Sequence, residues 1–151
     1  MDLIRTITLK DNIHLTPELK AIVDDLCQDA DIVLPDITAP YDMAIAYTEG
    51  EVTLNLRGDK TPDAIELAIG LRSLRGVLRD YTQITDNFQA AVASGDLQRF
   101  EAIDLGKRAL HDEAADMIID MLSPRCRIGH GTARKLFTLI CTLQPSGKTL
   151  S

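Results

Sequence analysis

The fold is decided by residues 41–56, which read YDMAIAYTEGEVTLNL. Apolar residues alternate with polar or small ones on both sides of Glu49-Gly50, a period of two that is typical of strands with one buried face. A glycine at this place favours the tight turn that joins two antiparallel strands. The stretch therefore predicts a β-hairpin with strands at 41–47 and 52–56.

The flanking segments extend this sheet. Residues 3–9 alternate β-branched and polar side chains, and residues 65–71 carry apolar side chains at every second position, so each predicts a strand. The alanine and leucine content of residues 65–71 leaves helix as an alternative, although strand is favoured. Thr16-Pro17 is typical of a helix start, and residues 29–40 indicate a loop.

From Arg72 onward the apolar residues follow a helical period. The first long helix is expected to end at Gly95, and a second, capped by Asp96, to run to about Leu122. A last helix is expected from about Gly131 to Leu143, with these residues buried: Leu136, Phe137, Leu139, Ile140 and Leu143.

The predicted fold class is α+β, with a small, mostly antiparallel sheet of three to four strands packed against about four helices. Residues 1–143 are expected to form a single domain, and residues 144–151 a flexible tail.

Composition narrows the class of protein. The chain has 151 residues, of which 45% are hydrophobic and 26% charged, as in an average globular domain. No apolar run is long enough to cross a membrane and the N-terminus lacks the pattern of a secretory signal, so a cytoplasmic protein is expected. The three cysteines lie far apart, and no dinucleotide or phosphate-loop fingerprint is present, so neither metal nor other cofactor is expected.

Charge is distributed unevenly along the chain. The net charge is −7, and residues 1–60 hold 5 basic and 12 acidic side chains, whereas residues 61–151 hold 11 of each. Trp is absent and only 3 Phe and 3 Tyr are present, so few rings could stack on bases. Both observations argue against nucleic acid as a partner.

The basic residues of the first long helix form a row. Arg72, Arg75 and Arg79 fall within an arc of roughly 60°, on the side opposite Leu74 and Tyr81. No carboxylate stands where an intrahelical partner of Arg75 or Arg79 would lie. The row is either a solvated face, including one paired with the acidic N-terminal half, or a surface that binds a phosphate, a carboxylate or an acidic partner.

Residues 125–135, which read RCRIGHGTARK, place cations at a predicted helix start. Unpaired backbone N–H groups at such a start favour an anion, whereas nearby cations oppose the usual preference for acidic residues. The residues predicted to hold an anion here are Arg127, His130, Thr132, Arg134 and Lys135. The structural alternative is that both glycines are plain turn residues and that a neighbouring carboxylate offsets the charge.

The second long helix carries two residues capable of proton transfer. His111 has no histidine or carboxylate three or four residues away, which excludes a helical metal pair, and a histidine at the edge of an apolar face is more often structural. Lys107 falls in the middle of the apolar arc, so its ammonium group must reach solvent, pair or face a pocket.

Two stretches of this half resemble a known family. Residues 101–113, EAIDLGKRALHDE, and 132–141, TARKLFTLIC, are similar to those of a bacterial group known as uncharacterised protein family 0262. Residues 39–41 and 75–81 resemble it as well, so the similarity covers nearly the whole chain in order. It implies no activity, ligand or catalytic residue, because none is established for that family.

Together these residues predict a non-catalytic binding or regulatory protein that recognises an anionic small molecule or an acidic protein through the arginine row and residues 125–135. The alternative is an enzyme acting on a phosphorylated small molecule, with Lys107 or His111 as the proton-transfer group. In a third interpretation, the row pairs with the acidic first half of another copy in a homo-oligomer.

Overall fold

The computed structural model describes residues 3–10, 13–60 and 63–143. The elements follow the order β1 Ile4–Leu9, α1 Pro17–Asp29, β2 Ile32–Val33, β3 Tyr41–Thr48, β4 Glu51–Arg57, β5 Ala64–Gly70, α2 Leu71–Ser94, α3 Leu97–Leu122, β6 Arg127–Ile128 and α4 His130–Leu143. The predicted α+β class is confirmed. The predicted tail, residues 144–151, lies outside the described residues.

The main sheet has four strands in the order β1-β3-β4-β5. The predicted hairpin is confirmed, because β3 and β4 pair antiparallel from Asp42 opposite Arg57 to Thr48 opposite Glu51. Gly50 in its turn has φ +103°, which L side chains rarely adopt. β5 adds antiparallel to β4, and β1 adds parallel to β3. Strand is therefore correct for residues 64–70, whereas Leu71 begins α2 instead of ending the strand.

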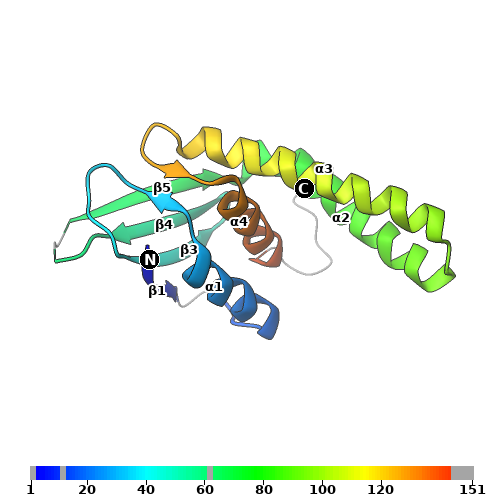
Figure 1. Ribbon diagram of the computed structural model, residues 1–151, viewed down its shortest axis with the longest axis horizontal. Coiled ribbons are helices and arrows are strands. Elements are labelled where there is room, and N and C mark those ends of the chain that lie inside the picture. Colours follow the sequence, from blue (N-terminus) through cyan, green and yellow to red (C-terminus); the bar gives the residue numbers. More distant parts are fainter. Residues whose placement is uncertain (1–2, 11–12, 61–62, 144–151) are drawn as a thin grey trace.

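The core lies between one face of the sheet and the helices that pack on it. Alternate residues of the hairpin, such as Ile45 and Leu54, are fully buried. Helices α1 and α4 pack together on this side of the molecule, where the parallel pairing of β1 and β3 makes α1 the crossover between two strands (Figure 1). Thr16 caps α1 as expected, since its hydroxyl accepts a hydrogen bond from the Leu19 N–H at 3.1 Å.

A second sheet of two short strands was not predicted. Residues 29–40 were expected to be a loop, but Ile32 and Val33 pair antiparallel with Ile128 and Arg127. Two-residue strands leave no periodic pattern to detect, and their pairing depends on contacts between distant segments. This ribbon joins the end of α1 to the start of α4.

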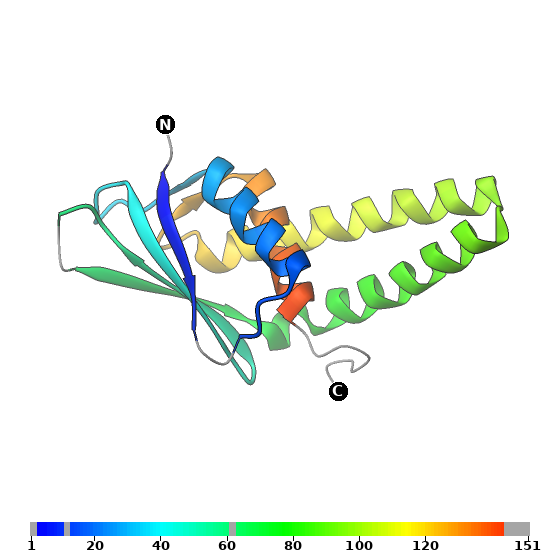
Figure 2. The ribbon, with the colours of Figure 1, turned by 90° about the horizontal axis from the view of Figure 1, so that it is seen from below.

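Helices α2 and α3 form a long antiparallel hairpin, which we call the arm. Figure 2 shows that it extends well beyond the sheet and α4. Gly95 ends α2 in the left-handed conformation, and the Asp96 side chain accepts a hydrogen bond from the Arg99 N–H at 3.1 Å, as predicted. The two helices approach closely at Gly106, where an added Cβ would lie 2.6 Å from the Cδ1 of Ile84.

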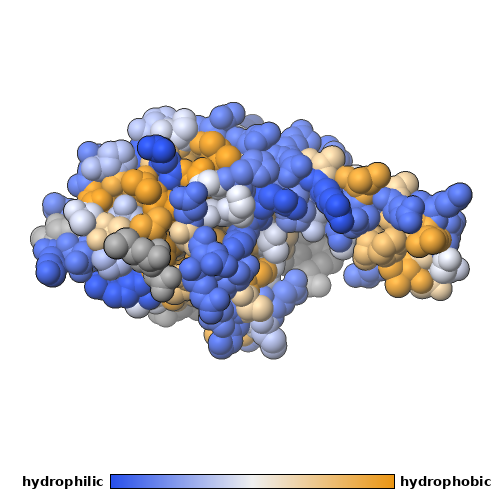
Figure 3. All heavy atoms as spheres, viewed as in Figure 1, coloured by the Kyte–Doolittle hydropathy of each residue, from blue (hydrophilic) through white to orange (hydrophobic). Residues whose placement is uncertain are grey.

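The free end of the arm exposes apolar side chains. Val92 is 55% exposed and Leu97 66%, and hydrophobic spheres gather at this end in Figure 3. Phe88 and Phe100 stack across the two helices with their ring centroids 4.8 Å apart. The end of the arm is thus held together by contacts within the hairpin itself.

Helix α4 lies close to its expected position. It begins at His130, one residue before the predicted Gly131, and Leu136, Phe137, Leu139 and Ile140 are buried as predicted. Leu143 is only partly buried, because it stands at the last turn of the helix, where less of the core covers it.

Candidate functional site

The arginine row, Arg72, Arg75 and Arg79, lies exposed on the first half of α2. The opposite side of this half-helix is buried through Leu74 and Val77. With a rise of about 1.5 Å per residue, the three Cα atoms are spaced by roughly 4.5 and 6 Å along the helix axis. Within the described part of the chain, no carboxylate forms an ion pair with any of the three arginines.

Most basic side chains of residues 125–135 have partners in the folded chain. The Arg125 guanidinium donates to the Glu66 backbone carbonyl at 2.7 Å. The other pairs join α4 to α1 and α3, and they are His130 with Asp116 at 3.4 Å, Arg134 with Asp112 at 3.8 Å, and Lys135 with Asp25 at 3.4 Å and Asp29 at 3.8 Å. Three aspartates of α3, Asp104, Asp112 and Asp116, therefore pair with basic side chains of α3 and α4.

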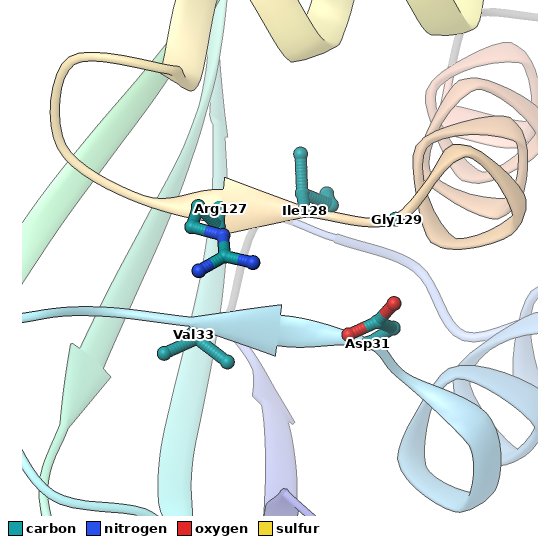
Figure 4. A pocket seen from close by; sticks show the side chains of 5 residues that line it. All are labelled: Asp31, Val33, Arg127, Ile128 and Gly129. Atoms are coloured by element: carbon teal, nitrogen blue, oxygen red, sulfur yellow. The ribbon is translucent and has the colours of Figure 1, made fainter.

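The start of α4 is bound to Asp31, at the end of the loop that follows α1. The Asp31 N–H donates to the Thr132 hydroxyl at 2.7 Å, and the Asp31 carbonyl accepts from the Gly129 N–H at 2.9 Å. Figure 4 shows the Asp31 carboxylate beside Gly129, where an added Cβ would lie 2.5 Å from the Asp31 Oδ2. A carboxylate of the chain itself thus lies at the helix start, the place that favours negative charge.

Arg127 lies apart from this contact. Its guanidinium extends from β6 toward β2 over a hollow of about 280 Å³ lined also by Asp31 and Val33 (Figure 4). Arg127 is exposed, and no carboxylate pairs with it among the described residues. Among the basic side chains of residues 125–135, Arg127 is therefore the one without an ion pair or side-chain hydrogen bond to the described part of the chain.

His111 lies where the arm meets α4. Its Nε2 lies 3.0 Å from the Tyr81 hydroxyl, and its ring meets those of Tyr81 and Phe137 edge-on at 4.9 and 5.3 Å. Burial, followed by the charges of Arg134 and Lys107, lowers the pKa of His111 from its ordinary 6.5. The histidine is therefore neutral at pH 7.

We expect the stability of the protein to fall through His111 as the pH drops below 6.5. The unfolded chain takes up this proton at the ordinary pKa of 6.5 whereas the folded chain resists it, so the stabilisation present above pH 6.5 is lost as the pH falls toward the lowered folded pKa. Urea denaturation at a series of pH values measures this slope. The slope should be shallower in His111→Gln and unchanged in His14→Gln, which removes an exposed histidine; equal slopes in all three proteins would contradict the prediction.

Lys107 of α3 packs against α2 within the arm. Its ammonium nitrogen lies 4.2 Å from the centre of the Phe88 ring and 5.9 Å from that of Tyr81, in the geometry of cation–π contacts. A shallow cavity of about 340 Å³ beside His111 is lined by Gly131, Arg134, Lys135 and Thr138, and Lys107 does not line it. The structure thus brings His111 and the start of α4 together, while it places the Lys107 ammonium group over the Phe88 ring.

A larger cavity was not foreseen from the sequence. It measures about 490 Å³ and lies between the start of α1, the middle of α2 and the end of α4. Tyr81, Thr85 and Cys141 are among its lining residues. The sequence signal that could have indicated this cavity is the set of threonines on α2 and α4, at positions that a fully packed core would fill with apolar residues.

Among the described residues, no group of three or more histidine, cysteine or acidic side chains could hold a metal ion. In the same part of the chain, no helix is long and apolar enough to cross a membrane.

Comparison with known proteins gives a family match but no activity. The model of the uncharacterised protein family (UPF0262) matches residues 2–146. A UPF0262 protein of Sphingopyxis alaskensis is 33% identical over 108 residues, which cover 72% of this chain and 66% of that relative, just under two thirds of its length. A UPF0262 protein of Rhodospirillum rubrum is 28% identical over 130 residues, covering 86% and 81%, and one of Cereibacter sphaeroides is 30% identical over 136 residues, covering 86% of each chain. No solved structure matches.

Proposed function

Because the chain belongs to the uncharacterised protein family UPF0262, whose name carries no activity, we propose a function from the geometry of α2. The protein is a non-catalytic binding protein whose arginine row docks an acidic segment of a protein partner. The observation that carries this proposal is the exposed row of three guanidinium groups without a carboxylate partner in the described part of the chain.

The contrast with other cations of the chain supports this choice. A carboxylate lies beside each of these side chains: Arg5, Lys20, Arg108, Arg134 and Lys135. The arginines of the row instead repel one another, since Arg75 and Arg79 are one helical turn apart. An acidic partner relieves this repulsion, and guanidinium groups suit carboxylates because they bind them with two parallel hydrogen bonds.

The shape of the surface favours a protein segment over a small anion. The row lies along a convex helix, and Arg72, Arg75 and Arg79 do not line the cavities of about 280, 340 and 490 Å³ described above. A small ligand needs a concave site that covers most of its surface. A helix or strand with carboxylates spaced by one turn, in contrast, reaches several arginines at once.

Fluorescence polarisation with a labelled glutamate-rich helical peptide tests the proposal, with glutamates spaced four and three residues apart and a glutamine version as the neutral probe. We expect binding of the glutamate peptide that weakens steeply with salt. Arg75→Glu/Arg79→Glu should weaken it by about ten-fold or more, because two attractions become repulsions.

The matched control is Arg99→Glu/Arg108→Glu, which changes the net charge equally on the exposed surface of α3. Equal losses in both double variants, or undiminished binding by the Arg75/Arg79 variant, would refute a specific role of the row. Light scattering across a salt series adds a second readout. Self-association that only the Arg75/Arg79 variant abolishes would identify the acidic partner as another copy of this chain.

A further inference from the structure

The cavity of about 490 Å³ between α1, α2 and α4 differs in character from the arginine row. Its volume lies in the range of ordinary small-molecule sites. Five of the nine residues that line it are threonines, and a sixth, Tyr81, adds a phenol. Such a wall is rich in hydroxyl groups, unlike the apolar contacts of the core nearby.

The charge of this cavity is negative. Glu18, in the first turn of α1, and Asp86, on α2, line it, and none of its described lining residues is a lysine, arginine or histidine. Burial raises the pKa of the Tyr81 phenol and, to about 12, that of the Cys141 thiol. Both groups are therefore neutral at pH 7, and the two carboxylates set the charge of the lining.

Three of the hydroxyl groups in this wall are available to a ligand as acceptors. The hydroxyls of Thr82, Thr138 and Thr142 each donate their proton to the carbonyl four residues earlier in their own helix. Their oxygen lone pairs remain as acceptors, as do the oxygens of the two carboxylates. A ligand that suits this wall must supply several donors.

The cavity also holds a polar atom hidden from solvent. The Thr85 hydroxyl is buried beside the Tyr81 phenol, and its contact with that phenol falls outside standard hydrogen-bond geometry. A buried polar group without a partner costs free energy, which a bound ligand can recover.

We propose that this cavity binds a small organic cation with a primary ammonium group. Such a group carries three donors and a positive charge, which match the threonine acceptors and the carboxylates of Glu18 and Asp86. The inference goes beyond the proposed function, since it concerns another surface and a ligand of opposite charge.

The test uses the full chain and 1,5-diaminopentane, whose two ammonium groups match two carboxylates, with 1,5-pentanediol as the neutral probe and glutarate as the anionic one. Isothermal titration measures affinity, and backbone amide NMR shifts locate the site. We expect only the diamine to bind, with shifts concentrated at residues 81–86 and 138–142. Glu18→Gln/Asp86→Asn should weaken binding by about ten-fold or more.

Asp24→Asn/Asp80→Asn is the matched control, because it removes the same charge from exposed positions of the same two helices and should leave binding within about two-fold. Thr85→Val keeps the shape of the side chain while removing its hydroxyl, and should weaken binding of the diamine. Equal binding of the diol, equal losses in the two double variants, or shifts spread over the acidic surface would each overturn the proposal. Because the arginine row is intact in all these variants, failure here leaves the docking proposal untouched.

Discussion

Phe137→Ala is expected to lower the free energy of unfolding by about 3–5 kcal/mol. Phe137 is fully buried in α4, and its ring meets Tyr81 of α2 and His111 of α3 edge-on, each with centroids 5.3 Å apart. Truncation removes the apolar contact that joins three helices and leaves a cavity between them. Urea denaturation followed by circular dichroism measures the loss.

Phe88→Ala is the matched control for this change. Phe88 lies on the arm, only partly buried, and stacks on Phe100 alone among the described rings. We expect a smaller loss than for Phe137→Ala, because the free end of the arm can adjust around the shortened side chain. Equal losses for the two variants would contradict the view that Phe137 holds the arm to the body.

Thr132→Val is expected to cost about 1–3 kcal/mol although the side chain keeps its shape. Thr132 is 5% exposed, and its hydroxyl accepts the hydrogen bond of the Asp31 N–H. Valine leaves that N–H without its partner and places a methyl group against it. Chemical denaturation measures the loss, and hydrogen exchange of the Asp31 amide gives a local readout.

Thr132→Ser separates the hydrogen bond from packing in this pair. Serine keeps the hydroxyl and loses a methyl group, so the Asp31 amide should stay protected from exchange, whereas in Thr132→Val its exchange should accelerate. Protection that is unchanged in Thr132→Val would show that the bond to Asp31 does not hold the start of α4.

The sequence predicted elements well wherever local chemistry decides them. The alternation of residues 41–56, the Thr16-Pro17 start and the Gly95-Asp96 turn each depend on neighbouring residues, and the structure confirms all three. The parallel addition of β1 and the pairing of β2 with β6 depend on chain segments that lie far apart in sequence. Periodicity carries no information on such pairing.

The same division applies to the candidate residues. The absence of a partner for Arg75 and Arg79 within their own helix could be read from spacing, but the distant aspartates beside His130, Arg134 and Lys135 could not. A helical wheel showed that Lys107 lies within an apolar arc, while its position over Phe88 depends on the packing of α2 against α3. The cavity lined by Tyr81 and Cys141 forms only where three helices meet, so it cannot be predicted from any one of them. Its only trace in the sequence is the number of threonines on these helices.

Opposite charges thus occur on different parts of one helix. The first half of α2 carries the arginine row, and its middle contributes Asp86 to the cavity. A protein partner on the row and a small cation in the cavity would therefore both contact α2. Binding at the arginine row and binding in the cavity can be tested independently, because the variants that disrupt the two surfaces share no residue.

The α2–α3 arm can change in length without disturbing the rest of the fold. Beyond the contacts of Tyr81 and His111 with α4, the two helices hold each other through facing pairs such as Ile84 with Gly106 and Phe88 with Phe100. Seven residues make nearly two full helical turns, so removing or adding seven in both helices rotates their faces by only about 20°. The length of the arm can therefore differ between relatives, while the arginine row and the cavity stay in place.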